Sequence, residues 1–172
     1  RDDAAQIRAM AGDLSREAGA ELYRHYKDTA VMGIVEVVKK AGKILNNLSD
    51  CKRDILQFNP DVIILVDYPG FNLKIAKFAK SRGLKVFYYI APKVWSWKEH
   101  RVKELRKYVD RLYIIFPFEK DYFTQRGVEA IYLGNPLADL ESMDTNESIE
   151  VFRQKHHLSN SKFIALFPGS RK

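Results

Sequence analysis

Three short segments contain residue types that suit chemistry. Residues 67–72 (DYPGFN) include an aspartate, residues 91–97 (APKVWSW) include a lysine and two tryptophans, and residues 168–171 (PGSR) include a glycine, a serine and an arginine. Asp67 directly follows five apolar residues. A carboxylate at such a place costs desolvation free energy unless it is hydrogen-bonded or faces a cleft. That environment can raise the pKa of the carboxyl group and suit it to accept a proton from a hydroxyl. A turn-forming or helix-capping aspartate is the alternative interpretation of Asp67.

The other polar and aromatic candidates also have two interpretations each. Asn72 is most simply a helix cap, and its amide could instead orient a ligand. Trp95 and Trp97 flank one serine and could form a stacking wall for a sugar or a lipid, although packing in a core or interface is equally consistent. Ser170 and Arg171 follow a glycine whose backbone N–H groups could approach an anion, but this segment matches neither standard glycine-rich phosphate motif.

The elements that must position these residues alternate along the chain. A turn is expected at residues 68–70, and Gly83 and Gly127 should end the helices before them. The apolar run at 61–66 is typical of a strand buried on both faces. This alternation predicts an α/β fold with a doubly wound, mostly parallel Rossmann-like sheet, whose ligands bind at the carboxyl ends of the strands. Strands are expected at 7–11, 21–26, 61–66, 84–90, 111–116, 128–133 and 163–167, and helices at 13–18, 34–58, 72–82, 97–108, 119–126 and 149–157.

A broad apolar stripe runs through residues 34–48 at helical spacing, with lysines away from it. The default interpretation is a helix that packs on the core. A cationic amphipathic helix that dips into a bilayer surface is the alternative. The residues assigned to that surface are Ile34, Val37, Val38 and Ile44.

Composition narrows the functional classes. The chain has 172 residues, a formal net charge of +7 and 46% hydrophobic residues, which excludes a disordered polyelectrolyte. No apolar run is long enough to span a bilayer, and the start of the chain is not typical of a secretory signal. The basic balance favours anionic partners, but the charge is spread and includes no nucleic-acid-binding motif. Cys51 is expected to be a buried or half-buried apolar residue, and the four histidines lack metal-ligand spacing.

Five segments in order resemble those of the lipid-A-disaccharide synthase family. Together they cover the chain from about residue 7 to residue 171. The matching segments are residues 30–37 (AVMGIVEV), 67–72 (DYPGFN), 92–98 (PKVWSWK), 116–120 (FPFEK) and 166–171 (LFPGSR).

The resemblance implies an inverting glycosyltransferase with two Rossmann-like domains. Its reaction joins UDP-2,3-diacylglucosamine to 2,3-diacylglucosamine 1-phosphate and releases UDP. The implied setting is the cytoplasmic face of the bacterial inner membrane, in lipopolysaccharide synthesis. No metal or other cofactor is expected, and a homodimer stays open. The implied domains are an acceptor-side domain at 1–135 without its first strand-loop, a linker and helix at 136–160, and a truncated donor-binding domain from 161.

The resemblance also assigns roles to particular residues. Asp67 becomes the favoured general base for the attacking 6-hydroxyl. Asn72, Trp95 and Trp97 are assigned to the acceptor side, and Ser170 and Arg171 to the donor diphosphate or nucleotide. Residues 1–172 alone are expected to be inactive.

This sequence departs from the family pattern at one position, because Asn135 stands where the family often has histidine. A histidine's role there is therefore in doubt. There are two alternative hypotheses. The first is a related enzyme of the same two-domain architecture, or an epimerase-like enzyme, that acts on a different UDP-sugar. The second is a non-catalytic basic α/β module that binds nucleic acid.

Overall fold

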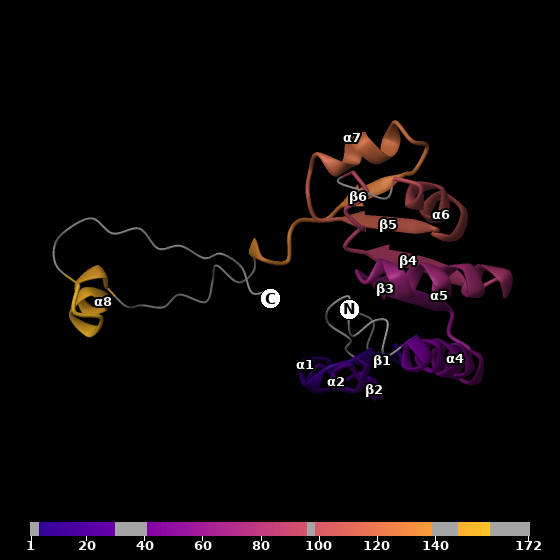
Figure 1. The fold of residues 1–172 in the computed structure, drawn as a ribbon, viewed down its shortest axis with the longest axis horizontal. Helices are drawn as coiled ribbons and strands as arrows, with labels where there is room; N and C mark the ends of the chain where they lie inside the picture. The colour runs from indigo at the N-terminus through magenta and orange to yellow at the C-terminus, as the bar shows by residue number, and fades with distance from the viewer. Residues whose placement is uncertain (1–3, 30–40, 96–98, 139–147, 159–172) are drawn as a thin grey trace. The chain divides into compact units, whose positions relative to one another are not determined.

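The computed structural model describes residues 4–29, 41–95, 99–138 and 148–158. The chain divides into two units, residues 1–134 and 135–172, and strands alternate with helices in the first (Figure 1). The described strands are β1 (Arg8–Ala11), β2 (Glu21–His25), β3 (Val62–Val66), β4 (Lys85–Tyr89), β5 (Arg111–Ile114) and β6 (Ala130–Tyr132). The described helices are α1 (Asp13–Glu17), α2 (Tyr26–Thr29), α4 (Ala41–Phe58), α5 (Pro69–Ser81), α6 (Arg101–Tyr108), α7 (Glu119–Thr124) and α8 (Ile149–Lys155).

Every described strand pair is parallel. β1 pairs with β2, while β3, β4, β5 and β6 form a second sheet in chain order. Helices α5, α6 and α7 connect its successive strands, as crossovers between parallel neighbours require. The predicted α/β class with a parallel, Rossmann-like arrangement is confirmed. The strands are shorter than predicted, and β5 ends at Ile114 rather than at Phe116.

The core of the first unit lies between the four-stranded sheet and its helices. β4 and β5 contribute alternate buried residues, among them Val86, Tyr88 and Leu112. α5 lays its small residues Ala76 and Ala79, both 0% exposed, against this core, which lets the helix backbone approach closely. Burial at alternate positions of β4 and β5 follows from the two-residue period of a strand.

The prediction that β3 is buried on both faces is wrong for part of the strand. Leu65 is buried, but Ile64 is 63% exposed and Val66 is 50% exposed. β3 is an edge strand of the four-stranded sheet in the described part of the chain. Successive side chains of a strand point to opposite faces, so Leu65 lies on the covered face while Ile64 and Val66 lie on the other.

Helix α5 begins earlier than predicted. Tyr68 is its N-cap and Pro69 its first residue, so residues 68–70 form the start of a helix rather than a turn. Proline suits that position because its missing N–H is one that the first helical turn leaves unpaired. The prediction that Asn72 caps the helix is therefore wrong. Gly83 follows the C-cap of α5 with φ of +76°, as predicted, whereas α7 ends at Thr124, earlier than the predicted Arg126, and Gly127 follows with φ of +69°.

Helix α4 packs one face against the core, since Leu48, Cys51 and Ile55 contact it. Ile44 is half-buried, while Leu45 is 58% exposed. Burial raises the pKa of the Cys51 thiol to about 11, with the nearby Asp54 carboxylate adding to the shift. The expectation of a half-buried, apolar cysteine is confirmed. Ile34, Val37 and Val38 lie outside the described residues.

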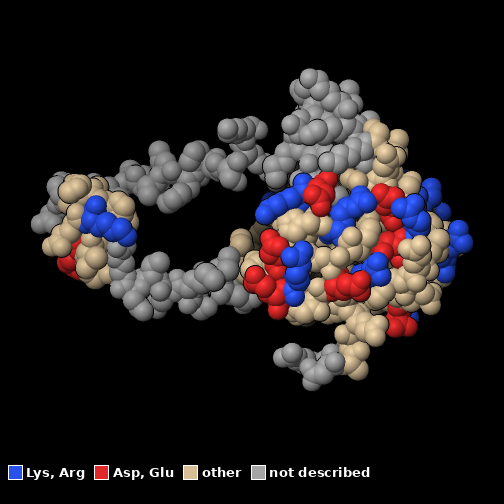
Figure 2. Space-filling model, turned by 90° about the horizontal axis from the view of Figure 1, so that it is seen from below, with Lys and Arg blue, Asp and Glu red and all other residues tan. Residues whose placement is uncertain are grey.

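Charged groups join the two-stranded sheet to α4. The Arg24 guanidinium donates to Asn47 at 2.7 Å and to Asp50 at 2.8 Å, and Arg8 pairs with Asp54 at 2.8 Å. The bond from Arg24 lowers the pKa of Asp50. Basic and acidic side chains are interspersed on the face shown in Figure 2, as the spread of charge along the sequence predicts.

In the second unit, Ser148 caps α8. Its hydroxyl accepts from the Val151 N–H at 3.3 Å, and the Phe152 and His156 rings lie tilted to each other with centroids 4.5 Å apart. A serine at this position satisfies one of the backbone donors that a helix start leaves open. Part of the helix predicted at 149–157 is thus confirmed, as α8. The strand predicted at 163–167 lies outside the described residues.

Candidate active site

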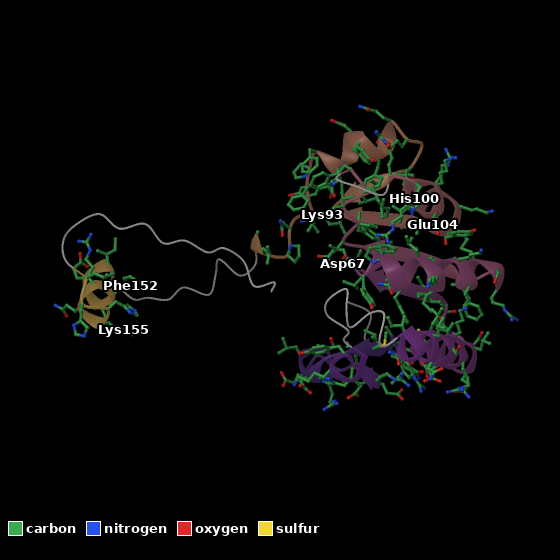
Figure 3. The ribbon with its side chains drawn as sticks, viewed as in Figure 1. Asp67, Lys93, His100, Glu104, Phe152 and Lys155 are labelled. Atoms are coloured by element: carbon green, nitrogen blue, oxygen red, sulfur yellow. The ribbon has the colours of Figure 1, made fainter. Side chains whose placement is uncertain are left out.

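The segments after β3, β4 and β5 gather at the carboxyl edge of the four-stranded sheet, because neighbouring parallel strands end on the same side. Asp67 follows β3, and Lys93 and Trp95 follow β4. Figure 3 shows Asp67 and Lys93 at this same edge. Both side chains are exposed, so their charged groups are open to a ligand.

Asp67 has an unusual backbone conformation. Its φ is +45°, and that of the next residue, Tyr68, is +42°. Left-handed conformations cost roughly 1–2 kcal/mol for residues with a β-carbon, although aspartate tolerates them better than most. Two in succession persist where the surrounding structure enforces them. The chain therefore bends sharply at the end of β3, directly before α5.

Two side chains hold this bend through the backbone of Asp67. The Asn72 amide donates from Nδ2 to the Asp67 carbonyl at 2.7 Å and to the Val66 carbonyl at 3.0 Å. The Tyr88 hydroxyl, from β4, donates to the same Asp67 carbonyl at 2.5 Å. The Asp67 N–H in turn donates to the Tyr89 carbonyl at 3.0 Å. The main chain of Asp67 is thus held at both its N–H and its C=O, while its carboxylate extends outward.

Tyr88 is an interior donor that sequence reasoning missed. Tyr88 is 0% exposed, and this burial raises the pKa of its hydroxyl well above the ordinary value. The nearby Asp67 carboxylate raises that pKa further. The hydroxyl therefore keeps its proton and its role as donor at neutral pH. An alternating strand pattern predicts that Tyr88 is buried, but it does not predict which carbonyl 21 residues away its hydroxyl meets.

A second strained residue shapes the segment after β4. Ile90 has φ of +61°, a rare conformation for a β-branched residue. The bend places Pro92 and Val94 inside the unit and leaves Lys93 and Trp95 exposed. The Ala91 N–H donates to the Tyr113 carbonyl of β5 at 3.2 Å, which secures the segment to the sheet.

Glu119 links the segments after β4 and β5. Trp95 donates from Nε1 to Oε1 of Glu119 at 3.0 Å, and the Phe116 N–H donates to Oε2 at 3.3 Å. Glu119 is only 1% exposed. It is the first residue of α7, where the helix dipole favours a negative charge. Its position in the 116–120 segment marks it in the sequence, but its contact with Trp95 depends on tertiary structure.

Three aromatic side chains form a cluster beside this carboxylate, which we call the aromatic shelf (Trp95, Phe116 and Phe118). Trp95 meets Phe118 edge to face with centroids 5.3 Å apart, and Phe116 stacks on Phe118 at 5.7 Å. Trp95 is 40% exposed and Phe118 54% exposed. The Lys93 ammonium lies 5.7 Å from the centre of the Phe116 ring. The edge therefore offers apolar surface with a cation at its rim.

The remaining predicted site residues lie elsewhere or outside the described part of the chain. Trp97, Ser170 and Arg171 lie outside the described residues. Ile44 belongs to α4. Asn135 accepts from the Leu137 N–H at 3.0 Å and so forms a turn within its own segment. In the described parts of the chain, no three or more His, Cys, Asp or Glu side chains form a group that could hold a metal ion.

A depression elsewhere on the first unit does not compete with this site. It has a volume of about 470 Å³ and is lined by Lys85, Phe87, Asp110, Arg111 and Glu129, at the amino ends of β4, β5 and β6. It lies at the opposite edge from Asp67. Asp110 is engaged structurally, because it accepts from the Val86 N–H at 2.8 Å and from Lys80 at 2.7 Å. None of the described helices is both long and apolar enough to cross a membrane.

Comparison with known proteins gives a consistent result. The sequence profile of the family described as lipid-A-disaccharide synthetase matches residues 2–172. A lipid-A-disaccharide synthase of Trichlorobacter lovleyi is 39% identical over 99% of this chain and 44% of its own length. Proteins of the same name from Coxiella burnetii and Geobacter metallireducens are 35% and 40% identical, over 97% and 95% of this chain and 44% and 42% of their own. The chain thus spans less than half the length of these curated relatives.

Proposed function

The chain belongs to the lipid-A-disaccharide synthetase family, and on that premise we propose that it carries the acceptor side of a glycosyltransferase. In this proposal the enzyme joins UDP-2,3-diacylglucosamine to 2,3-diacylglucosamine 1-phosphate with inversion at the anomeric carbon. The observation that carries the proposal is the exposed carboxylate of Asp67 on a backbone fixed by Asn72 and Tyr88. A general base must be held rigidly and still reach its substrate.

The reaction is a single displacement. The 6-hydroxyl oxygen of the acceptor forms a bond to the anomeric carbon of the donor while the bond from that carbon to the UDP oxygen breaks. Asp67 takes the hydroxyl proton as the oxygen attacks, which increases its nucleophilicity. The bond-breaking electron pair and the developing negative charge leave with UDP. The proposal needs no metal ion, since backbone N–H groups and basic side chains can stabilise that charge.

Other residues take supporting roles in this scheme. Asn72 acts by holding the Asp67 backbone, because both hydrogens of its amide are directed to main-chain carbonyls. Trp95, with Trp97, forms part of the acceptor wall. Ser170 and Arg171 contact the donor diphosphate or nucleotide, a role that rests on the resemblance of their segment to the family.

We also propose peripheral attachment to the cytoplasmic face of the inner membrane, because both substrates are amphiphiles. Ile34, Val37, Val38 and Ile44 are the residues assigned to that surface. Support comes from α4, where exposed Leu45 lies beside half-buried Ile44. Flotation with anionic vesicles tests the assignment: Val37→Glu combined with Val38→Glu should abolish binding in a folded protein.

The Asp67→Asn variant of the full-length protein tests the central proposal. Asparagine keeps the size and backbone preferences of aspartate but cannot accept the proton. Turnover with UDP-diacylglucosamine and the acylated acceptor should fall by roughly 10²-fold or more. Asp61→Asn, a change at an exposed aspartate directly before β3, is the matched control and should leave turnover unchanged. Near-normal turnover of Asp67→Asn would refute the role, and a panel of other UDP-sugars tests the rival enzyme class.

A further inference from the structure

We propose that the aromatic shelf is a subsite for one acyl chain of the acceptor and that Glu119 is the positioning residue that sets it. The inference rests on the proposed function, because it names which part of an acylated substrate this edge of the sheet receives. Glu119 does not touch the substrate in this scheme. It acts through Trp95 and through the backbone of Phe116.

The Glu119 carboxylate is buried and fully used by two donors. Removing a charged group from water is costly, and Glu119 is 1% exposed. Its two oxygens accept from the Trp95 indole and the Phe116 N–H, which belong to segments following different strands. Bonds to a charged acceptor are stronger than neutral ones. The carboxylate therefore fixes the indole relative to the segment after β5.

The aromatic shelf presents an apolar surface to solvent. The indole N–H is the one polar group of a tryptophan side chain, and here Glu119 accepts its hydrogen. The phenyl rings of Phe116 and Phe118 have no polar atoms. The outward surface thus offers no hydrogen bond from these side chains, which suits an apolar occupant. The edge-to-face meeting of Trp95 and Phe118, at 78° between ring planes, makes an angular surface that suits a methylene chain.

A lysine lies at the rim of the aromatic shelf. Lys93 is exposed and places its ammonium beside the Phe116 ring, within the same cluster. Figure 3 shows Lys93 at the carboxyl edge that also holds Asp67. An apolar surface bordered by a cation fits a substrate that has acyl chains and a phosphate on one sugar. A neutral hydrocarbon would gain nothing from that charge, so the acylated sugar phosphate is the occupant that both features favour.

The test compares a long-chain acceptor with its acetyl analogue in the full-length protein. Glu119→Gln keeps the shape of the side chain but places an amide N–H₂ where a donor already points. KM for the long-chain acceptor should rise roughly ten-fold, equivalent to losing one or two buried methylene contacts, while kcat/KM for the acetyl analogue stays unchanged. Phe118→Ser, at an exposed position, should do the same without altering the buried carboxylate. Glu129→Gln, at an exposed glutamate before β6, is the matched control.

Two results would overturn the inference. Equal losses on both acceptors would show that Glu119 only supports the fold, and an unchanged chain-length preference in the Glu119 and Phe118 variants would show that the shelf binds no chain. Quenching of tryptophan fluorescence by each acceptor measures binding without turnover. A wild-type protein that prefers the long chain in binding but transfers no sugar would refute the proposed function and support the subsite.

Discussion

Removing the Tyr88 hydroxyl is the sharpest test of how Asp67 is held. Tyr88→Phe deletes one donor to the Asp67 carbonyl, but the Asn72 amide continues to serve that acceptor. A net hydrogen bond contributes about 0.5–1.5 kcal/mol, so the free energy of unfolding should fall by roughly 1 kcal/mol. Asn72→Ala removes bonds to two carbonyls, and the Val66 carbonyl loses its side-chain donor. Its cost should be about 2 kcal/mol.

The double variant gives the decisive number. With both donors gone, the Asp67 carbonyl has lost both side-chain partners. The cost stays at the lower end of the roughly 1–3 kcal/mol of a buried unsatisfied group, because Asp67 is exposed. The two changes should therefore be more than additive, with a coupling energy of about 1 kcal/mol. Independent sites add to within about 0.3–0.5 kcal/mol, so the coupling is measurable.

Urea unfolding of the chain provides the assay. The two tryptophans, Trp95 and Trp97, both belong to the first unit, so their fluorescence follows the unit that contains the bend. Tyr89→Phe is the matched control, because alternation along β4 turns Tyr89 to the other face, and it should not couple to Asn72→Ala. Additive losses for Tyr88 and Asn72 would refute the view that they share one carbonyl as partner.

Two further predictions follow from the described geometry. Burial raises the pKa of the Cys51 thiol from its ordinary value of 9.0 to about 11, so the folded chain holds this proton more tightly than the unfolded chain. The free energy of unfolding should therefore fall by roughly 1–3 kcal/mol as pH rises from 9 to 11. Urea titrations at the two pH values measure this fall, and Cys51→Ala should lessen it. Asp67→Val should lower the thermal midpoint and reduce the free energy of unfolding by about 1–2 kcal/mol, since a β-branched residue is poorly suited to φ of +45°. Asp67→Asn is the control and should leave the midpoint nearly unchanged. Equal midpoints for the two variants would contradict the presence of backbone strain at this residue.

Much of the fold could be predicted because local signals and tertiary structure agree. Gly83 and Gly127 follow helices where their positive φ is needed, and the apolar runs of β4 and β5 form the core strands. The start of α5 shows the limit. Asn72 is a good capping residue by type, but Pro69 suits the first helical position, and the asparagine amide is used on the preceding carbonyls instead. Residue type alone does not choose between those two uses.

The site was predicted less completely for a related reason. Asp67 could be found because a polar residue after an apolar strand stands out in the sequence. Tyr88 could not be found, and the 116–120 segment marks Glu119 without predicting its contact, because each bonds to a partner 21 or 24 residues away. A buried tyrosine and a helix-start glutamate are ordinary within their own elements. Their significance emerges only when neighbouring strands bring Tyr88 beneath Asp67 and Trp95 over Glu119.

Because Asn72 and Tyr88 bond to a peptide oxygen of residue 67 and not to its side chain, this position accepts other side chains that tolerate φ of +45° without changes to the surrounding structure. A short non-natural acid that tolerates φ of +45° would inherit the same placement from Asn72 and Tyr88. Acids of different basicity at this position would show whether the rate depends on the proton affinity of the group, as the proposed general-base role requires. Natural sequences could drift in chemistry by the same route while their architecture stays intact.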